Sequence, residues 1–321
     1  MPEQLRYPRS RAAKRADPEP ARLADNLIPP PPVSRVLTLL FALSLAAGCG
    51  GDDDDSDPGD GPGDPPDASQ DLSPVEAVPG ARCEIAERVG IVLVTEGRGV
   101  RADLFDRTDP WVTDPAESDS ACELHDFIVQ QCDGCSDDQI CGADARCTAI
   151  PRRDTGARLV VRSGGDQQVF DADPATGELG GDITLAGEAV SIEVEAFGQK
   201  VTLAEETAVP DLLTGFSATL RGAYDAPEGI DASWDPAPAG SHLFTRVPVN
   251  HHAAGPTFTE CAADAADGAL TISQPMLEPL AVATGLEFQG FDHIRFAAAE
   301  TARGCVELRF TRVQSVGLEG I

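Results

Sequence analysis

The sequence predicts a mostly β protein, in which an antiparallel β-sandwich follows a small disulfide-rich N-terminal subdomain and a disordered acidic stalk. Three observations support this prediction. Apolar and polar residues alternate with a period of two after residue 156, the cysteines after Cys49 are even in number, and an aspartate-rich segment contains no base. These features divide the chain into a leader (1–48), a stalk (49–81), a Cys-rich subdomain (82–150) and a β-sandwich domain (151–321).

The leader has the pattern of a secretory signal. Residues 1–35 carry seven basic and four acidic side chains, and Val36–Gly48 has no charge and ends in small residues. This apolar run is shorter than the roughly 20 residues that a membrane-spanning helix needs. A start at Val33 would leave a compact leader with Arg35 as its positive end, so we expect the true translation start to lie near residue 33.

Cys49 lies directly after this run. The segment "LAAGC" resembles the bacterial lipobox, in which the cysteine receives a diacylglyceryl group, is further acylated with fatty acid such as palmitate, and becomes the first residue of the mature chain. The resemblance implies a lipoprotein anchored in the bilayer through Cys49. Gly50 rather than aspartate follows, which under the enterobacterial sorting rule favours the outer membrane. The alternative is ordinary signal cleavage near Ala47, with Cys49 as a spare thiol.

The stalk is too polar to fold. Residues 50–80 contain nine aspartates, one glutamate and no base, so they cannot bury enough apolar surface to offset the entropy of ordering. Prolines and like charges keep such a segment extended. A calcium loop is the alternative, but counting from Asp53 places Pro58 where the EF-hand pattern needs glycine.

The charge of the chain excludes one class of partner. The formal net charge is −30, and the part after residue 48 is more acidic still, because the leader holds seven of the 24 basic but only four of the 54 acidic side chains. Such a charge repels nucleic acid and anionic lipid head groups. We therefore expect no nucleic-acid partner.

Eight cysteines remain when Cys49 is acylated, and an even number in an exported chain predicts four disulfides. The array "CDGCSDDQICGADARC" (132–147) also fits paired zinc thiolates, although a zinc ribbon needs two C-x2-C pairs farther apart, so we expect no metal. The six cysteines between Cys83 and Cys147 can pair in fifteen ways. The pairs we expect are Cys132–Cys141, Cys135–Cys147, Cys83–Cys122 and Cys261–Cys305.

Period-2 alternation predicts half-buried antiparallel strands in the C-terminal half. In "CVELRF", it places Val306, Leu308 and Phe310 in the core and Glu307 and Arg309 on the solvent side. "SIEVEA" (191–196) alternates in the same way, and turn clusters rich in Gly, Asp and Pro separate the runs.

The sequence also predicts a further strand, a core tryptophan and a helix. "RVGIVLVTEG" (88–97) is a β-rich run ahead of the cysteine array, and Trp234 alternates with apolar residues as a core side chain does. The segment "SQPMLEPLAVATG" predicts a short helix that Ser273 caps and Gly285 ends.

The C-terminal module resembles a known group of proteins. "IDASWDPAPAGSHLF", the turn C-x2-D-x2-D-G (261–268) and "GFDHIRFAAAETARGCVELRF" are similar to uncharacterised lipoproteins of myxobacteria and their relatives, which also carry an acidic stalk and a short cysteine cluster. The similarity covers most of residues 132–310 and implies fold and location, but no activity. The chain departs from the group after Gly285, where "LEFQGFDHIRFAAAE" replaces the commoner arginine-containing strand.

Catalytic motifs are weak. Asp154, Thr155 and Gly156 resemble the D-T-G of aspartic proteases, but no second such motif exists and a plain turn fits better. His251 and His252 are adjacent and have no third metal ligand nearby. We expect no catalytic residue, no metal and no cofactor.

These observations favour a non-catalytic lipoprotein of the cell envelope that binds an unknown protein or glycan. The loop 249–258 is the one least explained by turn chemistry, and Asn250, His251, His252 and Phe258 are its candidate binding residues. The alternatives are a purely structural envelope protein and, more distantly, a hydrolase with a dispersed site.

Overall fold

A computed structural model describes residues 73–112, 114–126, 132, 134–183, 185, 189–249, 257–284, 288, 290–315 and 318. All of them belong to one compact unit that spans Pro65–Ile321. Strands dominate these segments, so the prediction of a mostly β fold is confirmed. The predicted leader and Cys49 lie outside the described residues, as does the stalk up to residue 72. The prediction of disorder is wrong for the end of the stalk, because Val75–Glu76 and Val78–Pro79 are strands paired with larger sheets and Ala77 is buried. Within the described part, no helix has the length and apolar character needed to cross a membrane.

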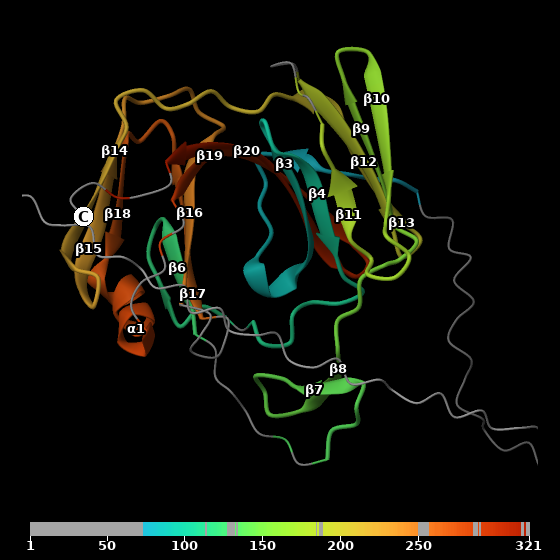
Figure 1. The fold of residues 1–321 in the computed structure, drawn as a ribbon, viewed down its shortest axis with the longest axis horizontal. Coiled ribbons are helices and arrows are strands. Elements are labelled where there is room, and N and C mark those ends of the chain that lie inside the picture. The colour runs from blue at the N-terminus through green and yellow to red at the C-terminus, as the bar shows by residue number, and fades with distance from the viewer. Residues whose placement is uncertain are drawn as a thin grey trace, which may run out of the picture. The chain divides into compact units, whose positions relative to one another are not determined.

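A ten-stranded sheet forms the centre of the fold (Figure 1). All its strand pairs are antiparallel except β3 with β20, which is parallel. Its strands, in spatial order, are β11 (Leu179–Gly181), β4 (Gly99–Leu104), β3 (Arg88–Thr95), β20 (Gly304–Ser315), β19 (Phe291–Thr301), β16 (His242–Pro248), β17 (Phe258–Asp264), β6 (Cys122–His125) and β5 (Glu117–Ser118), and β2 (Val78–Pro79) pairs with β19.

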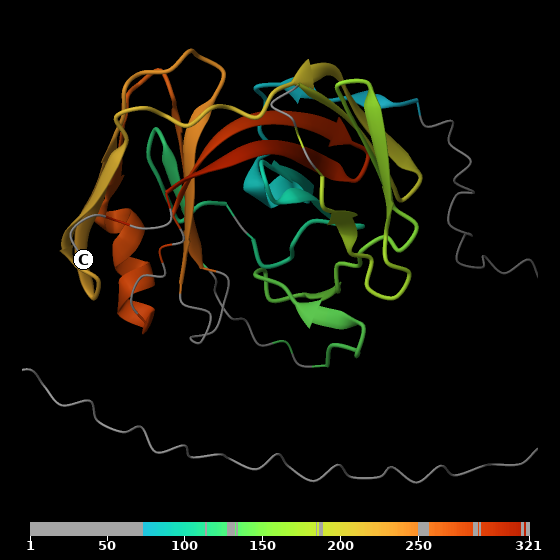
Figure 2. The same ribbon diagram turned by 45° about the horizontal axis from the view of Figure 1, so that its top comes forward.

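Two smaller sheets cover one face of the central sheet near its two ends (Figures 1 and 2). The five-stranded one consists of β1 (Val75–Glu76), β13 (Gln199–Thr207), β12 (Val190–Ala196), β9 (Arg158–Ser163) and β10 (Asp166–Asp171). The three-stranded one consists of β14 (Ser217–Ala223), β15 (Ala226–Ser233) and β18 (Ala269–Ser273), with α1 (Gln274–Thr284) beside it. The helix predicted after Ser273 is thus confirmed.

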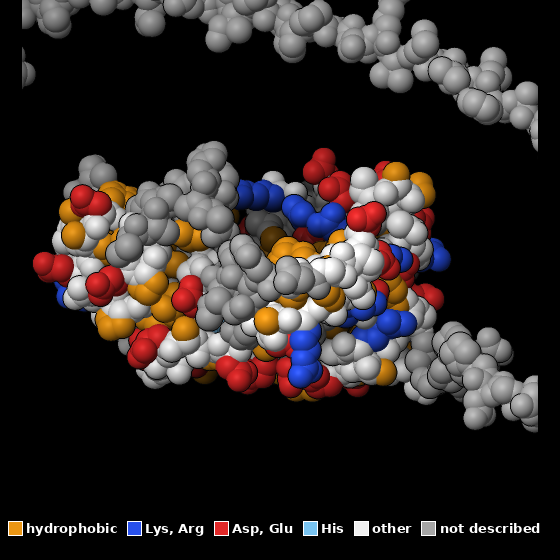
Figure 3. Space-filling model, turned by 90° about the horizontal axis from the view of Figure 1, so that it is seen from below, with side chains coloured by type: hydrophobic (Ala, Val, Ile, Leu, Met, Phe, Trp, Pro, Cys, Tyr) orange, Lys and Arg blue, Asp and Glu red, His pale blue; other side chains and the backbone are white. Residues whose placement is uncertain are grey.

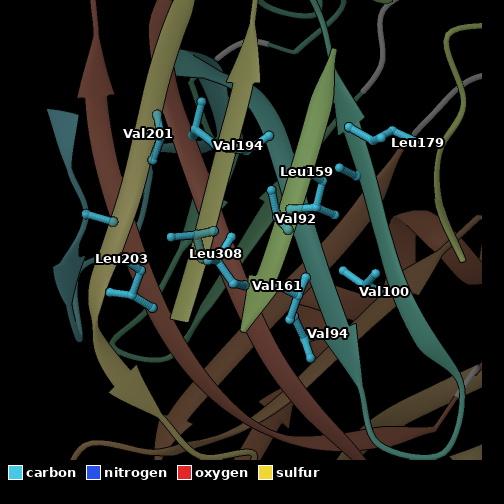
Figure 4. Packing of buried hydrophobic residues seen from close by; sticks show 14 of the residues in the cluster. Val92, Val94, Val100, Leu159, Val161, Leu179, Val194, Val201, Leu203 and Leu308 are labelled. Atoms are coloured by element: carbon cyan, nitrogen blue, oxygen red, sulfur yellow. The ribbon is translucent and has the colours of Figure 1, made fainter. Parts of the chain in front are cut away.

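The first apolar core lies between the five-stranded sheet and the β4–β3–β20–β19 part of the central sheet (Figure 4). Val92, Val94 and Leu308 of the central sheet pack against Leu159 and Val161 of β9, and all five are at most 1% exposed. Burying each such side chain stabilises the fold by about 1.5–3 kcal/mol. Alternation in these strands therefore does build a sandwich.

The second core lies between the other end of the central sheet, the three-stranded sheet and α1. Trp234 is 5% exposed and its indole Nε1 donates a hydrogen bond to the Ala265 carbonyl at 2.8 Å. Leu277 and Leu280 of α1 are fully buried in the same cluster. The prediction that Trp234 is a core side chain is confirmed.

The cysteine array forms a small hairpin of β7 (Gln139–Cys141) and β8 (Cys147–Ala149). The disulfides Cys132–Cys141 and Cys135–Cys147 are present as predicted. Sulfur atoms of Cys132, Cys135 and Cys147 lie within 4.8 Å of one another. Each of these sulfurs belongs to a disulfide, and disulfide formation removes the thiolates that zinc requires.

The other two predicted pairs are wrong. Cys83 bonds to Cys305, with a sequence separation of 222, and Cys122 bonds to Cys261, with a separation of 139. Cys122 and Cys261 occupy directly paired positions of β6 and β17. Which cysteines meet therefore depends on strand pairing across the sheet, and spacing along the chain does not reveal it.

The segment 82–125 is not separated from the strands that follow it. It supplies the 3-10 turn η1 (Ile85–Glu87) and four strands of the central sheet, and β3 pairs with β20 near the C-terminus. Within the described part of the chain, the hairpin of the cysteine array forms a two-stranded sheet of its own.

The long-range disulfides should contribute most to stability. Replacing both Cys83 and Cys305 by alanine is expected to lower the free energy of unfolding by about 5 kcal/mol on the chain-entropy estimate, against about 3 kcal/mol for Cys132 and Cys141, because the closed loop is longer. Denaturant unfolding of the two double variants checks the order. Mass spectrometry of non-reduced peptides should recover the cross-link between Cys83 and Cys305, and a cross-link between Cys83 and Cys122 would contradict the structure.

Candidate functional site

The face of the central sheet that the smaller sheets leave uncovered carries a buried ion network. We use this name for Arg82, Arg88, Glu260, Glu307 and Arg309. The Glu260 carboxylate, 1% exposed, lies 3.0 Å from Arg82, 3.3 Å from Arg88 and 3.4 Å from Arg309. One carboxylate therefore binds three arginines that come from segments far apart in the chain.

Glu307 is the second carboxylate of the network. Its Oε1 lies 2.6 Å from Arg309 and 3.5 Å from Arg88, and its Oε2 accepts a hydrogen bond from the backbone N–H of Cys83 at 2.9 Å. Glu307 is 0% exposed and Arg309 is 6% exposed. The prediction that both face solvent is wrong, because Cys83 and Arg88 of the N-terminal segment contact Glu307 and the Phe244 ring covers Arg309 on this face of β20.

The network requires the central sheet to curl. Arg88 lies on β3 and Glu260 on β17, with β20, β19 and β16 between them. Four strand spacings of about 4.8 Å would separate them by about 19 Å in a flat sheet, more than their two side chains can bridge. Their contact at 3.3 Å shows that this face is concave, and Figures 1 and 2 show β19 and β20 bending around it.

The neighbouring charges keep Glu260 and Arg309 ionised. Burial by itself would raise the pKa of Glu260, but Arg309, Arg88 and Arg82 outweigh it and hold that pKa well below the ordinary value. Burial would likewise lower the pKa of Arg309, and Glu260 and Glu307 raise it instead. Glu260 and Arg309 therefore both stay charged near neutral pH.

Aromatic rings line the network. The Arg309 guanidinium lies 4.7 Å from the centre of the Phe244 ring, and that of Arg82 lies 4.7 Å from the centre of Phe296. A cation over an aromatic face gains about 2 kcal/mol where water is excluded. The Phe244 ring thereby offsets part of the cost of burying the charge of Arg309, whereas the Arg82 side chain at the edge of the network is 33% exposed.

A cavity of about 410 Å³ opens beside the network, and we call it the concave pocket. Its volume falls in the range of small-ligand sites. Figure 3 shows a face of the molecule hollowed near its middle, with basic and hydrophobic side chains around the hollow. The residues that line the concave pocket are Ile85, Arg88, Val89, Gly90, Ile91, Asp103, Phe105, Arg107, Asp109, Pro110, Trp111, Val112, Ile140, Ile150, Pro151, Arg246 and Phe258.

Arg246 links the pocket to the network. It lies on β16 directly opposite Glu260 of β17, and its guanidinium stacks 3.7 Å from the centre of the Phe258 ring. Phe258 in turn stacks on His125. Burial lowers the pKa of Arg246, and Glu260 partly opposes this shift, so the side chain remains a cation.

The structure describes only Val249, Thr257 and Phe258 of the predicted binding loop, residues 249–258. Asn250, His251 and His252 lie outside the described residues. Phe258 lies in β17 and is 2% exposed, yet its ring lines the concave pocket. Of the four predicted residues, Phe258 is the one that the structure places at a candidate site.

The D-T-G sequence is a turn, as expected. Asp154 Oδ1 accepts a hydrogen bond from the Gly156 N–H at 2.8 Å, and its Oδ2 accepts one from the Phe197 N–H. Both carboxylate oxygens therefore serve local backbone structure.

Sequence reasoning missed the arginines and glutamates of the concave face. A signal was present, because Arg246, Glu260, Glu307 and Arg309 each lie in a strand among apolar or small residues. In a chain this acidic, arginines inside β-strands are candidates for buried pairing with glutamate.

Comparison with known proteins adds little to this geometry. No protein-family profile matches the chain, and no curated protein matches it. Two solved chicken structures are similar. One is a two-domain fibronectin type-III segment of tenascin (14% identity, 62% of this chain and 94% of that one, TM-score 0.16), and the other is the FN1–FN3 segment of CNTN1 (8% identity, 75% and 69%, TM-score 0.20). The resemblance to myxobacterial lipoproteins stays a prediction.

Removing the central carboxylate should destabilise the fold. Glu260→Gln is expected to cost about 3–5 kcal/mol at neutral pH, because it leaves buried arginines without their shared partner. The pKa of Glu260 is lower in the folded protein than in the unfolded chain. Its contribution is therefore complete above the ordinary glutamate value of 4.5 and is lost as the pH falls toward the folded-state pKa.

Urea unfolding of both proteins between pH 3 and pH 7 checks this expectation, and the gap between them should narrow at the acid end. Glu195→Gln, an exposed change of the same kind on β12, serves as control and should shift stability by at most about 0.5 kcal/mol. Equal losses for the two variants would show that the network does not stabilise the fold.

Proposed function

We propose that this protein is a lipid-anchored envelope lipoprotein that displays a disulfide-linked β fold to bind a protein or glycan partner. The concave pocket is the observation that carries the proposal. It combines mostly apolar walls with a few charged groups, as ligand-binding sites do, and the surrounding sheet and disulfides hold it rigid. The resemblance of "LAAGC" to the lipobox supports the anchor at Cys49, with the outer membrane as its location.

The segment between Cys49 and Ser73 would allow the anchored protein to reach a large or immobile partner. Cys49 and the first described residue, Ser73, are 24 residues apart in the sequence, and a fully extended chain of that length spans about 80 Å. Such reach adds nothing to the conversion of a small diffusing molecule. It does allow an anchored module to meet a partner that cannot approach the membrane.

The chemistry of the concave face supports binding over catalysis. The carboxylates of Glu260 and Glu307 are held by arginines, and the pKa of Glu260 lies well below its ordinary value. A general acid or base works best with a pKa near the operating pH. Glu260 therefore organises charge and does not exchange protons near neutral pH.

The anchor has a direct test. Cys49→Ala should abolish incorporation of labelled palmitate and leave the protein soluble or unprocessed, because the thiol is the acyl acceptor. Wild-type protein should be found in outer-membrane fractions. Undiminished labelling of the variant would refute the anchor, and recovery of the wild type in inner-membrane fractions would refute the location.

Binding is tested by capture. Immobilised mature protein should retain a protein or glycan from envelope or extracellular extracts, and Ile150→Glu at the pocket rim should weaken that capture. Ile150 is 40% exposed, so thermal unfolding should hardly change. The double substitution His251→Ala, His252→Ala tests the predicted loop in the same assay. A wild-type protein that retains nothing above control would favour a purely structural envelope role.

A further inference from the structure

We propose that the concave pocket binds a carboxylate carried on an apolar group, and that Arg246 is the residue that pairs with the carboxylate. This inference rests on the proposed binding function and names its ligand class. The ligand is a free acid of this kind or the C-terminal residue of a chain, and the two share the same chemistry.

Arg246 has donors to offer. Among the described residues, its guanidinium makes no hydrogen bond or ion pair within the usual distances, and its one close partner is the Phe258 ring at 3.7 Å. Stacking on a ring fixes the plane of a guanidinium but leaves its N–H groups at the edge. A planar carboxylate can accept two of those N–H groups at once.

The other arginines that line the pocket already have carboxylate partners. Arg88 pairs with Glu260 and Glu307, and Arg107 pairs with Asp106 at 2.8 Å. Of the two acidic lining residues, Asp103 is likewise held by Arg153 at 2.8 Å, and Asp109 Oδ1 accepts a hydrogen bond from the Trp111 backbone N–H at 2.9 Å. The buried Nε of Arg88 has no hydrogen-bond partner among the described residues, but its Nη2 is already held by two carboxylates. Arg246 is therefore the lining arginine that has no carboxylate partner within the described part of the chain.

The local charge also favours an anion. The buried ion network has three arginines against two glutamates, and Arg246 adds a fourth cation beside it. Burial lowers the pKa of Arg246, the nearby Arg309 and Arg88 lower it further, and Glu260 and Asp109 oppose the shift without reversing it. A carboxylate beside Arg246 would oppose the shift further, and the acidic remainder of the protein, with its net charge of −30, would repel anions elsewhere.

The apolar walls of the concave pocket favour an apolar group as the part of the ligand that carries the carboxylate. Ile85, Phe105, Val112, Ile140 and Ile150 present apolar surface to the pocket. The ring of Trp111 is held in place by a hydrogen bond from its Nε1 to the Cys141 carbonyl at 3.1 Å. A sugar ring needs several hydrogen-bond partners that such walls do not provide, whereas an aromatic or branched aliphatic group gains from burial here.

Calorimetry on the full chain, exported by its own leader and purified in mild detergent, tests the proposal with N-acetyl-L-phenylalanine as the probe. Three further ligands are compared with it. The amide of the same compound lacks the charge, and galacturonate carries the carboxylate on a polar ring. A tripeptide with a free C-terminal phenylalanine represents the end of a chain. We expect the acid and the tripeptide to bind, and the amide and galacturonate to bind at least tenfold more weakly. The tighter of the two acids identifies the source of the natural ligand.

Arg246→Gln should weaken binding of the acid about 10- to 100-fold, the effect of losing a charge-assisted pair, and leave binding of the amide unchanged. Arg158→Gln makes the same charge change on β9, where the partner Asp171 is 3.7 Å away, and should have no effect. Ile150→Glu should weaken acid binding at low salt more than at high salt. This rim variant keeps the test valid if Arg246→Gln does not fold.

Binding of the amide as tight as that of the acid, or tighter binding of galacturonate, would overturn the proposal. So would an Arg246→Gln variant that folds and binds the acid normally. Failure of the proposed function looks different, because the pocket would then bind the probe while no envelope partner is captured. Capture that survives Arg246→Gln would instead leave the binding function intact and place the ligand elsewhere.

Discussion

The buried carboxylate of Glu260 is the interaction on which the shape of the central sheet depends. It draws together arginines from the N-terminal segment, from β3 and from β20, and this contact is possible only when the sheet curls. Desolvating these charges is costly, and a buried ion pair is weak evidence for high stability. The network instead favours the curled form of the sheet, because in a flatter sheet the buried charges of Glu260 and Arg88 would be too far apart to pair.

The disulfides reinforce this geometry from both faces. Cys83–Cys305 lies on the concave side, where the Cys83 N–H also donates to Glu307. Cys122–Cys261 lies on the opposite side, within the apolar core under the three-stranded sheet. One covalent bond therefore holds each face of the sheet, close to the strands that carry the glutamates.

The concave pocket follows from the same arrangement. The curl places Arg246 at the border between the ion network and the cavity, and the array hairpin brings Ile140 and Ile150 to its wall. A rigid frame of this kind presents a ligand site at little cost in ordering on binding. The interaction that shapes the sheet thereby also positions the cation that we assign to the ligand.

The sequence by itself determined the alternating strands of the C-terminal half, the helix after Ser273 and the core role of Trp234, and it offered the pairing within the cysteine array as one of several possibilities. These features depend on periodicity or on cysteines about ten residues apart, so neighbouring residues carry the information. Only the tertiary structure decided the two long disulfides, the burial of Glu307 and Arg309, and the place of Arg246. Of the candidate site, only Phe258 could be predicted, because Arg82 and Glu260 are 178 residues apart and meet only once the sheet has paired and curled.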